Sequence, residues 1–155
     1  MGMADLKVTK DPNRLLTAGL GSCVGICLYD KANRIGGMAH IMLPTSLPTR
    51  GPVNTAKFAD TAVPELVQQM IKCGAARGNL VAKVAGGAQM FTFPGSSDVM
   101  RIGDRNAEAV WEMLKQQKIP LLVSDTGGNY GRTIEMCLST GKLYVRTIDR
   151  GEKVL

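Results

Sequence analysis

Short apolar runs alternate along this chain with segments rich in turn-forming residues. The first two runs, residues 23–29 (CVGICLY) and 35–43 (IGGMAHIML), are separated by the polar segment 30–34 (DKANR). Apolar runs of this length, bounded by turn residues, are typical of buried β-strands. The pattern therefore predicts two antiparallel strands joined as one hairpin.

Helical spacing begins after a loop at residues 45–54 that contains proline and glycine. The apolar positions that recur at this spacing are Ala59, Ala62, Val63, Leu66, Val67, Met70 and Ile71. They predict an amphipathic helix that ends near Gly74. Pro64 lies inside the pattern, so either the helix begins near Thr61 with Pro64 in its first turn, or it kinks at Pro64.

The second half of the chain predicts another helix and several more strands. The helix is expected over residues 104–117, with Asp104 as its N-cap. Strands are expected at residues 80–85, 120–124, 134–138 and 143–148, and turns or loops at 92–98, 125–131 and 139–142. The resulting order favours an α+β fold, with a mixed, mainly antiparallel sheet or sandwich-like core flanked by two main helices.

The composition is that of an ordinary globular protein. Of the 155 residues, 45% are apolar and 21% are charged, and we expect residues 1–155 to form one domain. No apolar run approaches the ~18 residues that cross a bilayer, so we expect no membrane insertion. Residues 1–10 lack the apolar core of a signal peptide, which favours a cytoplasmic location.

The formal net charge of +6 is compatible with an acidic protein or a nucleic acid as partner. The lysines and arginines are scattered, and the chain has only three Phe, three Tyr and one Trp. A stacking platform for bases is hard to build from so few aromatic residues, so we expect no nucleic-acid binding. A basic surface that steers an acidic protein partner is the better interpretation.

The only histidine and one glycine-flanked cysteine suggest a base and a nucleophile. Cys23 follows small residues, and Gly21 and Ser22 would let a substrate approach the backbone and aim N–H groups at an oxyanion. His40 and Cys23 are nearly equally far from the turn, so we expect the hairpin to place them opposite one another. Thr17 could supply a hydroxyl that orients the imidazole.

Plainer interpretations exist for the same residues. A cysteine or histidine on an apolar strand is usually a core residue, and the four cysteines of a cytosolic chain stay reduced. Cys23 and Cys27 would lie on the same strand face about 13 Å apart, which is too far to share one zinc ion. We therefore expect no metal and no cofactor.

Polar residues at turns and at the helix start are the remaining candidates for a binding edge. The glycine pairs at 86–87 and 127–128 lack the spacing of phosphate-binding loops and are interpreted as structural turns. Asn106 and Asn129 are expected to cap a helix and to close a turn. Arg132 could line a binding edge beside the second turn.

Several motifs together resemble the signature of the chemoreceptor glutamine deamidase (CheD) family. They are residues 17–24 (TAGLGSCV), 37–44 (GMAHIMLP), 57–62 (KFADTA), 85–91 (AGGAQMF), 102–106 (IGDRN), 125–129 (DTGGN) and 140–142 (TGK). The resemblance extends from about Lys7 to Ile148 and includes the spacing from cysteine to histidine. It implies a catalytic set of Cys23, His40 and Thr17, and a fold similar to that of toxin-type cysteine deamidases.

The resemblance also implies a substrate and partners. Family members are protein-glutamine glutaminases: they deamidate particular glutamines of methyl-accepting chemotaxis receptors to glutamate, and some bind a receptor-pathway phosphatase (CheC) at the active-site face. The reaction would pass through a thioester, and whether methyl esters are also hydrolysed stays open. His40 would either take the Cys23 proton during attack or hold a preformed thiolate–imidazolium pair.

A rival interpretation is a non-catalytic chemotaxis adaptor that only holds a receptor or the phosphatase. An adaptor has no need to keep Cys23, His40 and Thr17 intact. Two features depart from the family pattern. Pro64 interrupts a helix that family members usually continue, and the segment before Leu15 is short, which predicts a reduced first strand.

Overall fold

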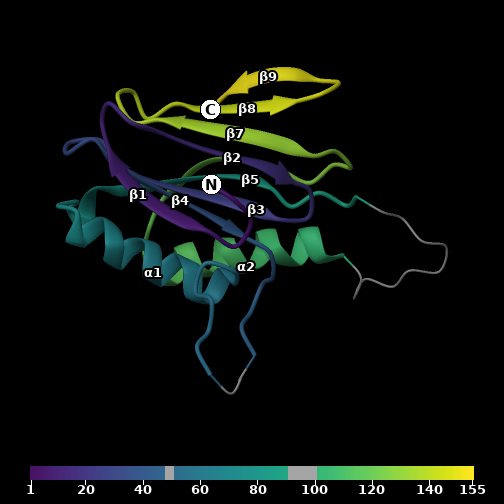
Figure 1. Ribbon diagram of the computed structural model, residues 1–155, viewed down its shortest axis with the longest axis horizontal. Helices are drawn as coiled ribbons and strands as arrows, with labels where there is room; N and C mark the ends of the chain where they lie inside the picture. The colour runs from purple at the N-terminus through teal and green to yellow at the C-terminus, as the bar shows by residue number, and fades with distance from the viewer. Residues whose placement is uncertain (48–50, 91–100) are drawn as a thin grey trace.

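The computed structural model describes residues 1–47, 51–90 and 101–155, whose strands and helices are stacked in three layers (Figure 1). The strands are β1 (Leu6–Lys10), β2 (Arg14–Leu20), β3 (Val24–Asp30), β4 (Ile35–Ile41), β5 (Leu80–Gly86), β6 (Leu121–Thr126), β7 (Arg132–Cys137), β8 (Leu143–Thr147) and β9 (Gly151–Val154). The helices are α1 (Ala59–Lys72), α2 (Ile102–Gln116) and the short 3₁₀ helix η1 (Arg77–Asn79).

The strands form two sheets. A five-stranded sheet has the order β1-β4-β3-β5-β6, and a four-stranded sheet has the order β2-β7-β8-β9. Neighbouring strands are antiparallel except for the β5–β6 pair. The expected α+β fold, with a mainly antiparallel, sandwich-like core flanked by two helices, is therefore confirmed. The expected similarity to toxin-type cysteine deamidases stays a prediction.

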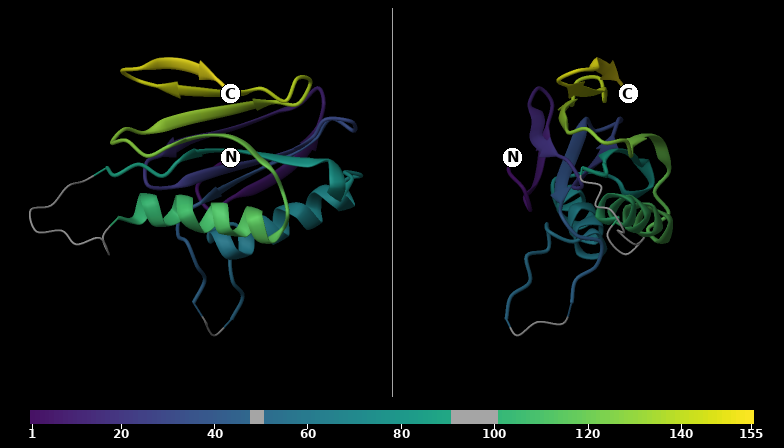
Figure 2. Two further views of the ribbon diagram at one scale, coloured as in Figure 1. Left: turned by 180° about the vertical axis from the view of Figure 1, so that it is seen from behind. Right: turned by 90° about the vertical axis from the view of Figure 1, so that its right-hand side faces the viewer.

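The five-stranded sheet is the middle layer, with α1 and α2 on one face and the four-stranded sheet on the other (Figure 2). Successive side chains of β3 alternate between these neighbours. Val24 and Ile26 pack toward the helices, whereas Cys27 and Tyr29 pack toward the second sheet. Every residue of β3 and β4 is buried, because both faces of the hairpin are covered, and this explains their unbroken apolar runs.

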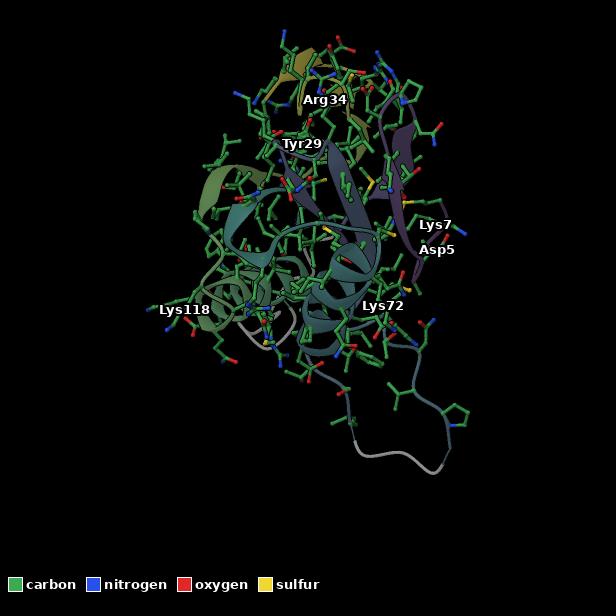
Figure 3. All side chains as sticks on the ribbon, turned by 90° about the vertical axis from the view of Figure 1, so that its left-hand side faces the viewer. Asp5, Lys7, Tyr29, Arg34, Lys72 and Lys118 are labelled. Atoms are coloured by element: carbon green, nitrogen blue, oxygen red, sulfur yellow. The ribbon has the colours of Figure 1, made fainter. Side chains whose placement is uncertain are left out.

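Tyr29 also joins the two sheets by a hydrogen bond. Its hydroxyl donates to the carbonyl of Leu138 at 2.6 Å, and the side chain is seen at the level of the upper sheet in Figure 3. In the same view Lys72, the last residue of α1, and Lys118, just beyond α2, lie on the opposite side of the molecule from Tyr29. The space between the sheets is thus closed at this end by a buried aromatic side chain.

The helices differ from the sequence-based expectation at their starts. α1 begins at Ala59 rather than near Thr61, so Pro64 lies inside the helix and removes one backbone hydrogen bond there. The N-cap of α2 is Arg101, so the prediction of Asp104 as N-cap is wrong. Asp104 instead lies in the first turn, where a carboxylate interacts favourably with the helix dipole.

Three strands were not predicted from the sequence: β1, β2 and β9. β1 pairs with β4 over five positions, so the expected reduction of the first strand is wrong. β9 is exposed at every position and therefore has no apolar pattern to detect. The predicted loop at 92–98 lies outside the described residues. None of the helices in the described ranges is long and apolar enough to cross a membrane.

The first turn of α2 packs directly against the backbone of the segment that follows β5. A Cβ atom added at Gly103 would lie 2.3 Å from the carbonyl oxygen of Ala88 and 2.7 Å from that of Gly87. Such distances are shorter than real Cβ contacts, and the neighbouring atoms are backbone, which cannot move aside independently. Only glycine at position 103 permits this approach.

We therefore expect Gly103→Ala to destabilise the protein by about 2 kcal/mol, because overpacking outweighs the better helix propensity of alanine. The matched control is Gly78→Ala, at an exposed position with open space around its Cβ. This control should stabilise slightly, by about 0.5 kcal/mol, through the unfolded chain. Urea unfolding of both variants checks the prediction, and equal midpoints would contradict the close approach.

Candidate active site

The imidazole of His40 is held by a residue from the other sheet. His40 lies on β4 and Thr17 on β2, and both side chains are fully buried. Thr17 Oγ1 lies 2.7 Å from His40 Nδ1, and the hydroxyl donates to the Met1 carbonyl at 3.2 Å. A hydroxyl that donates its single proton there accepts from Nδ1–H, so we assign the lone pair of the imidazole to Nε2.

His40 Nε2 is buried and has no hydrogen-bond partner among the described residues. Buried polar atoms are nearly always paired, so an unpaired ring nitrogen is a site at which a further interaction is expected. With Nδ1 occupied by Thr17, Nε2 is the nitrogen that can take a proton.

Cys23 lies on the same face of the sheet as His40, but not directly opposite. The residue paired with His40 is Gly25, and the ladder continues with Val24 opposite Ile41. Cys23 and Gly25 are two residues apart and share a face, which makes Cys23 a diagonal neighbour of His40. The expectation of direct opposition is therefore wrong.

The difference of register comes from the turn. The ladder closes with Asp30 opposite Ile35, so its centre lies between residues 32 and 33 rather than near 31–32. That shift moves the partner of His40 from Cys23 to Gly25. Gly25 has no side chain to fill the space above it, and Leu20 and Ile134 pack into that space from the second sheet.

Burial sets the resting protonation of both groups. It lowers the pKa of His40 below its ordinary value, and the positive N-terminal ammonium acts in the same direction. Burial raises the pKa of the Cys23 thiol, although its own backbone N–H partly opposes this. Both shifts favour a neutral thiol beside a neutral imidazole over a preformed thiolate–imidazolium pair.

The backbone before and after Cys23 is fixed by the segment that follows β5. The N–H of Ala88 donates to the carbonyl of Gly21 at 2.8 Å, and the N–H of Gly87 donates to that of Cys23 at 2.9 Å. Gly86 has φ +114°, and a Cβ there would lie 2.3 Å from the Cys23 carbonyl oxygen. The glycine pair is thus a structural turn, as expected, and it supports the cysteine.

The structure also places the other residues that the sequence suggested for the site. Gly21 and Ser22 precede Cys23 directly and are only partly buried, so a substrate can reach them. Asn106 does not cap α2; its side chain reaches the carbonyls of Ser22 and Met42, a role that its residue type and helical position did not indicate. In the described part of the chain, no group of three or more His, Cys, Asp or Glu residues could hold a metal ion.

A basic cleft of about 620 Å³ lies beside the end of β2. The guanidinium groups of Arg132 and Arg150 lie over the ring of Tyr130, at 4.5 Å and 4.4 Å from the ring centre. Arg132 is buried and paired with Asp125 at 3.3 Å. Arg132 lines this cleft, and the binding edge expected there stays a prediction. Gly19 of β2, the strand that precedes Cys23, also lines the cleft.

Cys137 provides a test of the resting state, because it is as buried as Cys23, at 7% against 8% exposure. A hydrogen bond from Thr140 lowers the pKa of Cys137, whereas burial raises that of Cys23. We expect iodoacetamide to modify Cys137 before Cys23 at neutral pH. The pH midpoint of the Cys23 rate should lie above that of an ordinary thiol, because burial raises the pKa of Cys23.

Peptide mapping by mass spectrometry measures both rates in one sample. Cys137→Ser is the matched control and should leave the Cys23 rate unchanged. Preferential modification of Cys23 at neutral pH would contradict the neutral pair and indicate a preformed thiolate.

Comparisons with known proteins identify the family of this chain. Residues 42–147 match the family model described as CheD chemotactic sensory transduction. A probable chemoreceptor glutamine deamidase CheD of Desulfitobacterium hafniense is 59% identical over the whole chain and 96% of its own length. A protein of the same description from Syntrophomonas wolfei is 54% identical over 100% of this chain and 96% of its own length. Another from Clostridium botulinum is 52% identical over 99% of this chain and 94% of its own length. The chain therefore belongs to the CheD family.

Proposed function

We propose that this protein deamidates glutamine side chains of chemotaxis receptors to glutamate, as a protein-glutamine glutaminase with Cys23 as nucleophile. His40 acts as the base and Thr17 positions its ring. The observation that carries the proposal is the Thr17–His40 hydrogen bond. It leaves Nε2 buried on the same sheet face as Cys23, without a partner among the described residues. The names of the relatives point to the same activity.

In the first half-reaction, His40 Nε2 takes the proton of the Cys23 thiol as sulfur attacks the glutamine side-chain carbonyl. The resulting imidazolium gives that proton to the leaving nitrogen, the C–N bond of the tetrahedral intermediate breaks, and ammonia departs to leave the thioester. In the second half-reaction His40 takes a proton from water, whose oxygen attacks the thioester. The proton then returns to the sulfur, and glutamate is released.

A neutral resting pair makes proton transfer part of the attack step. The lowered pKa of His40 keeps its imidazole unprotonated, and therefore able to act as a base, down to a lower pH than an exposed histidine. The oxyanion forms beside the segment of Gly21 and Ser22, where the backbone N–H of Cys23 is a candidate donor. One such donor typically contributes about 3 kcal/mol.

We also propose partners for this reaction. The cleft of Arg132, Arg150 and Tyr130 supports a basic surface that attracts an acidic receptor segment. A CheC-like phosphatase that covers the same face would slow deamidation by excluding the receptor. We further propose that residues 1–155 act as one deamidase domain in the cytoplasm, since both sheets contribute to the site.

Deamidation and the adaptor alternative predict different results with a receptor cytoplasmic fragment. The wild-type protein should release ammonia and add about one dalton at particular glutamines, and Cys23→Ala should abolish both signals. Cys137→Ala, at an equally buried thiol, should leave them in place. Binding of the fragment without any mass change in the wild-type protein would contradict the enzyme and favour the adaptor.

Thr17 offers a test of the positioning role. Thr17→Val keeps the shape of the side chain but removes the hydroxyl that bonds Nδ1, so we expect kcat to fall about 100-fold with little change in KM. Thr17→Ser keeps the hydroxyl and should retain most of the activity. Steady-state kinetics of the two variants check this, and wild-type activity in Thr17→Val would remove Thr17 from the site.

A further inference from the structure

A fully buried amide side chain crosses from the helical layer to the strand ends beside the candidate site. Asn106 lies in the second turn of α2 and has no exposed surface. Its Nδ2 donates to the carbonyl of Ser22 and to that of Met42, each at 2.9 Å. The start of α2, the start of β3 and the end of β4 meet at the same end of the molecule, on the right in Figure 1.

The two carbonyls belong to the backbone that carries the proposed nucleophile and base. Ser22 directly precedes Cys23, and Met42 lies two residues beyond His40. The β3–β4 ladder, continued one step beyond Val24 and Ile41, places Met42 opposite Cys23. Asn106 therefore ties together the two strand ends at the level of the nucleophile.

The bond to Ser22 has a consequence for the next N–H. In a trans peptide the C=O and N–H groups point in opposite directions, so holding the Ser22 carbonyl toward Asn106 fixes the direction of the Cys23 N–H. That N–H lies against the Cys23 sulfur and partly offsets the effect of burial on its pKa. The carbonyls of Gly21 and Cys23 accept from backbone N–H groups, whereas that of Ser22 accepts from a side chain.

The Asn106 amide leaves one buried acceptor without a hydrogen bond in the described part of the chain, which costs stability. Asn106 Oδ1 is buried and has no hydrogen-bond partner among the described residues. The reverse orientation of the amide would place Oδ1 against two carbonyl oxygens, so Nδ2 is assigned to face them. An apolar side chain of similar size would avoid the unpaired acceptor, which indicates that the two donors are what this position requires.

We infer that Asn106 is a positioning residue of the active site, which orients the Ser22–Cys23 peptide and thereby the thiol and N–H of Cys23. The inference rests on the proposed role of Cys23 in deamidation. Asn106 touches no reacting atom, and it acts through the Ser22 carbonyl.

The test replaces Asn106 by a side chain of similar size without donors. In Asn106→Leu, kcat for receptor deamidation should fall at least about 10-fold with KM unchanged, because the misplaced group is the nucleophile and not a substrate contact. The pH midpoint of Cys23 alkylation should rise, while that of Cys137 stays constant. Val110→Ala, a buried packing change in the same helix, is the control for general destabilisation and should leave both midpoints unchanged.

Asn106→Ala is the second variant if the leucine variant does not fold. Its smaller, uncharged side chain has no donor, so the same loss of kcat and the same rise of the Cys23 midpoint are expected. A folded variant with wild-type kcat and an unchanged Cys23 midpoint overturns the inference. A fall in kcat with an equal fall in Val110→Ala also overturns it.

The proposed function fails separately, if the wild-type protein does not deamidate or if Cys23→Ala remains active. Even then the alkylation midpoint of Cys23 decides whether Asn106 orients this thiol. A shifted midpoint supports the positioning role, and an unshifted midpoint refutes it.

Discussion

The hydrogen bond between Thr17 and His40 spans the interface of the two sheets, and the geometry of the site depends on it. Because the two residues belong to different sheets, the imidazole is oriented only when the sheets are packed in one relative position. The side chains of Leu20, Met38 and Ile134 fill the layer between them. A close-packed core of this kind resists small displacements, so the core that stabilises the fold also orients the proposed base.

Burial has two opposing effects on the chemistry. It holds the ring of His40 still and keeps it neutral, which suits a base, but it also keeps Cys23 protonated, which makes the free thiol a weak nucleophile. The two effects are reconciled if the proton moves only when a substrate carbonyl is in place to be attacked. A site arranged in this way reacts with a positioned amide more readily than with a small alkylating reagent, and this limits accidental modification of the thiol.

The sequence predicts the buried part of this structure better than its edges. The β3–β4 hairpin could be predicted because both of its faces are covered and most of its residues are apolar or small. β2 alternates between buried and exposed positions over only a few residues, and β9 is wholly exposed, so neither has a run of apolar residues to indicate a strand. The identity of the candidate base followed from its being the only histidine, whereas its pairing with Gly25 depended on the turn and could not be read from residue types.

Asn106 illustrates why the remainder of the site could not be predicted. An asparagine near a helix start is usually a cap, and nothing in the local sequence indicates that its amide reaches strand ends from two distant parts of the chain. The same is true of Gly86 and Gly103, whose missing side chains allow backbone segments to touch. The proposed nucleophile thus lies on a short loop whose carbonyls are held from outside the loop, by a turn and by a helix. Such support gives a partly exposed segment the rigidity of a strand. Under the proposed role of Asn106, the reactivity of Cys23 depends on the packing of α2, even though the thiol need not contact that helix.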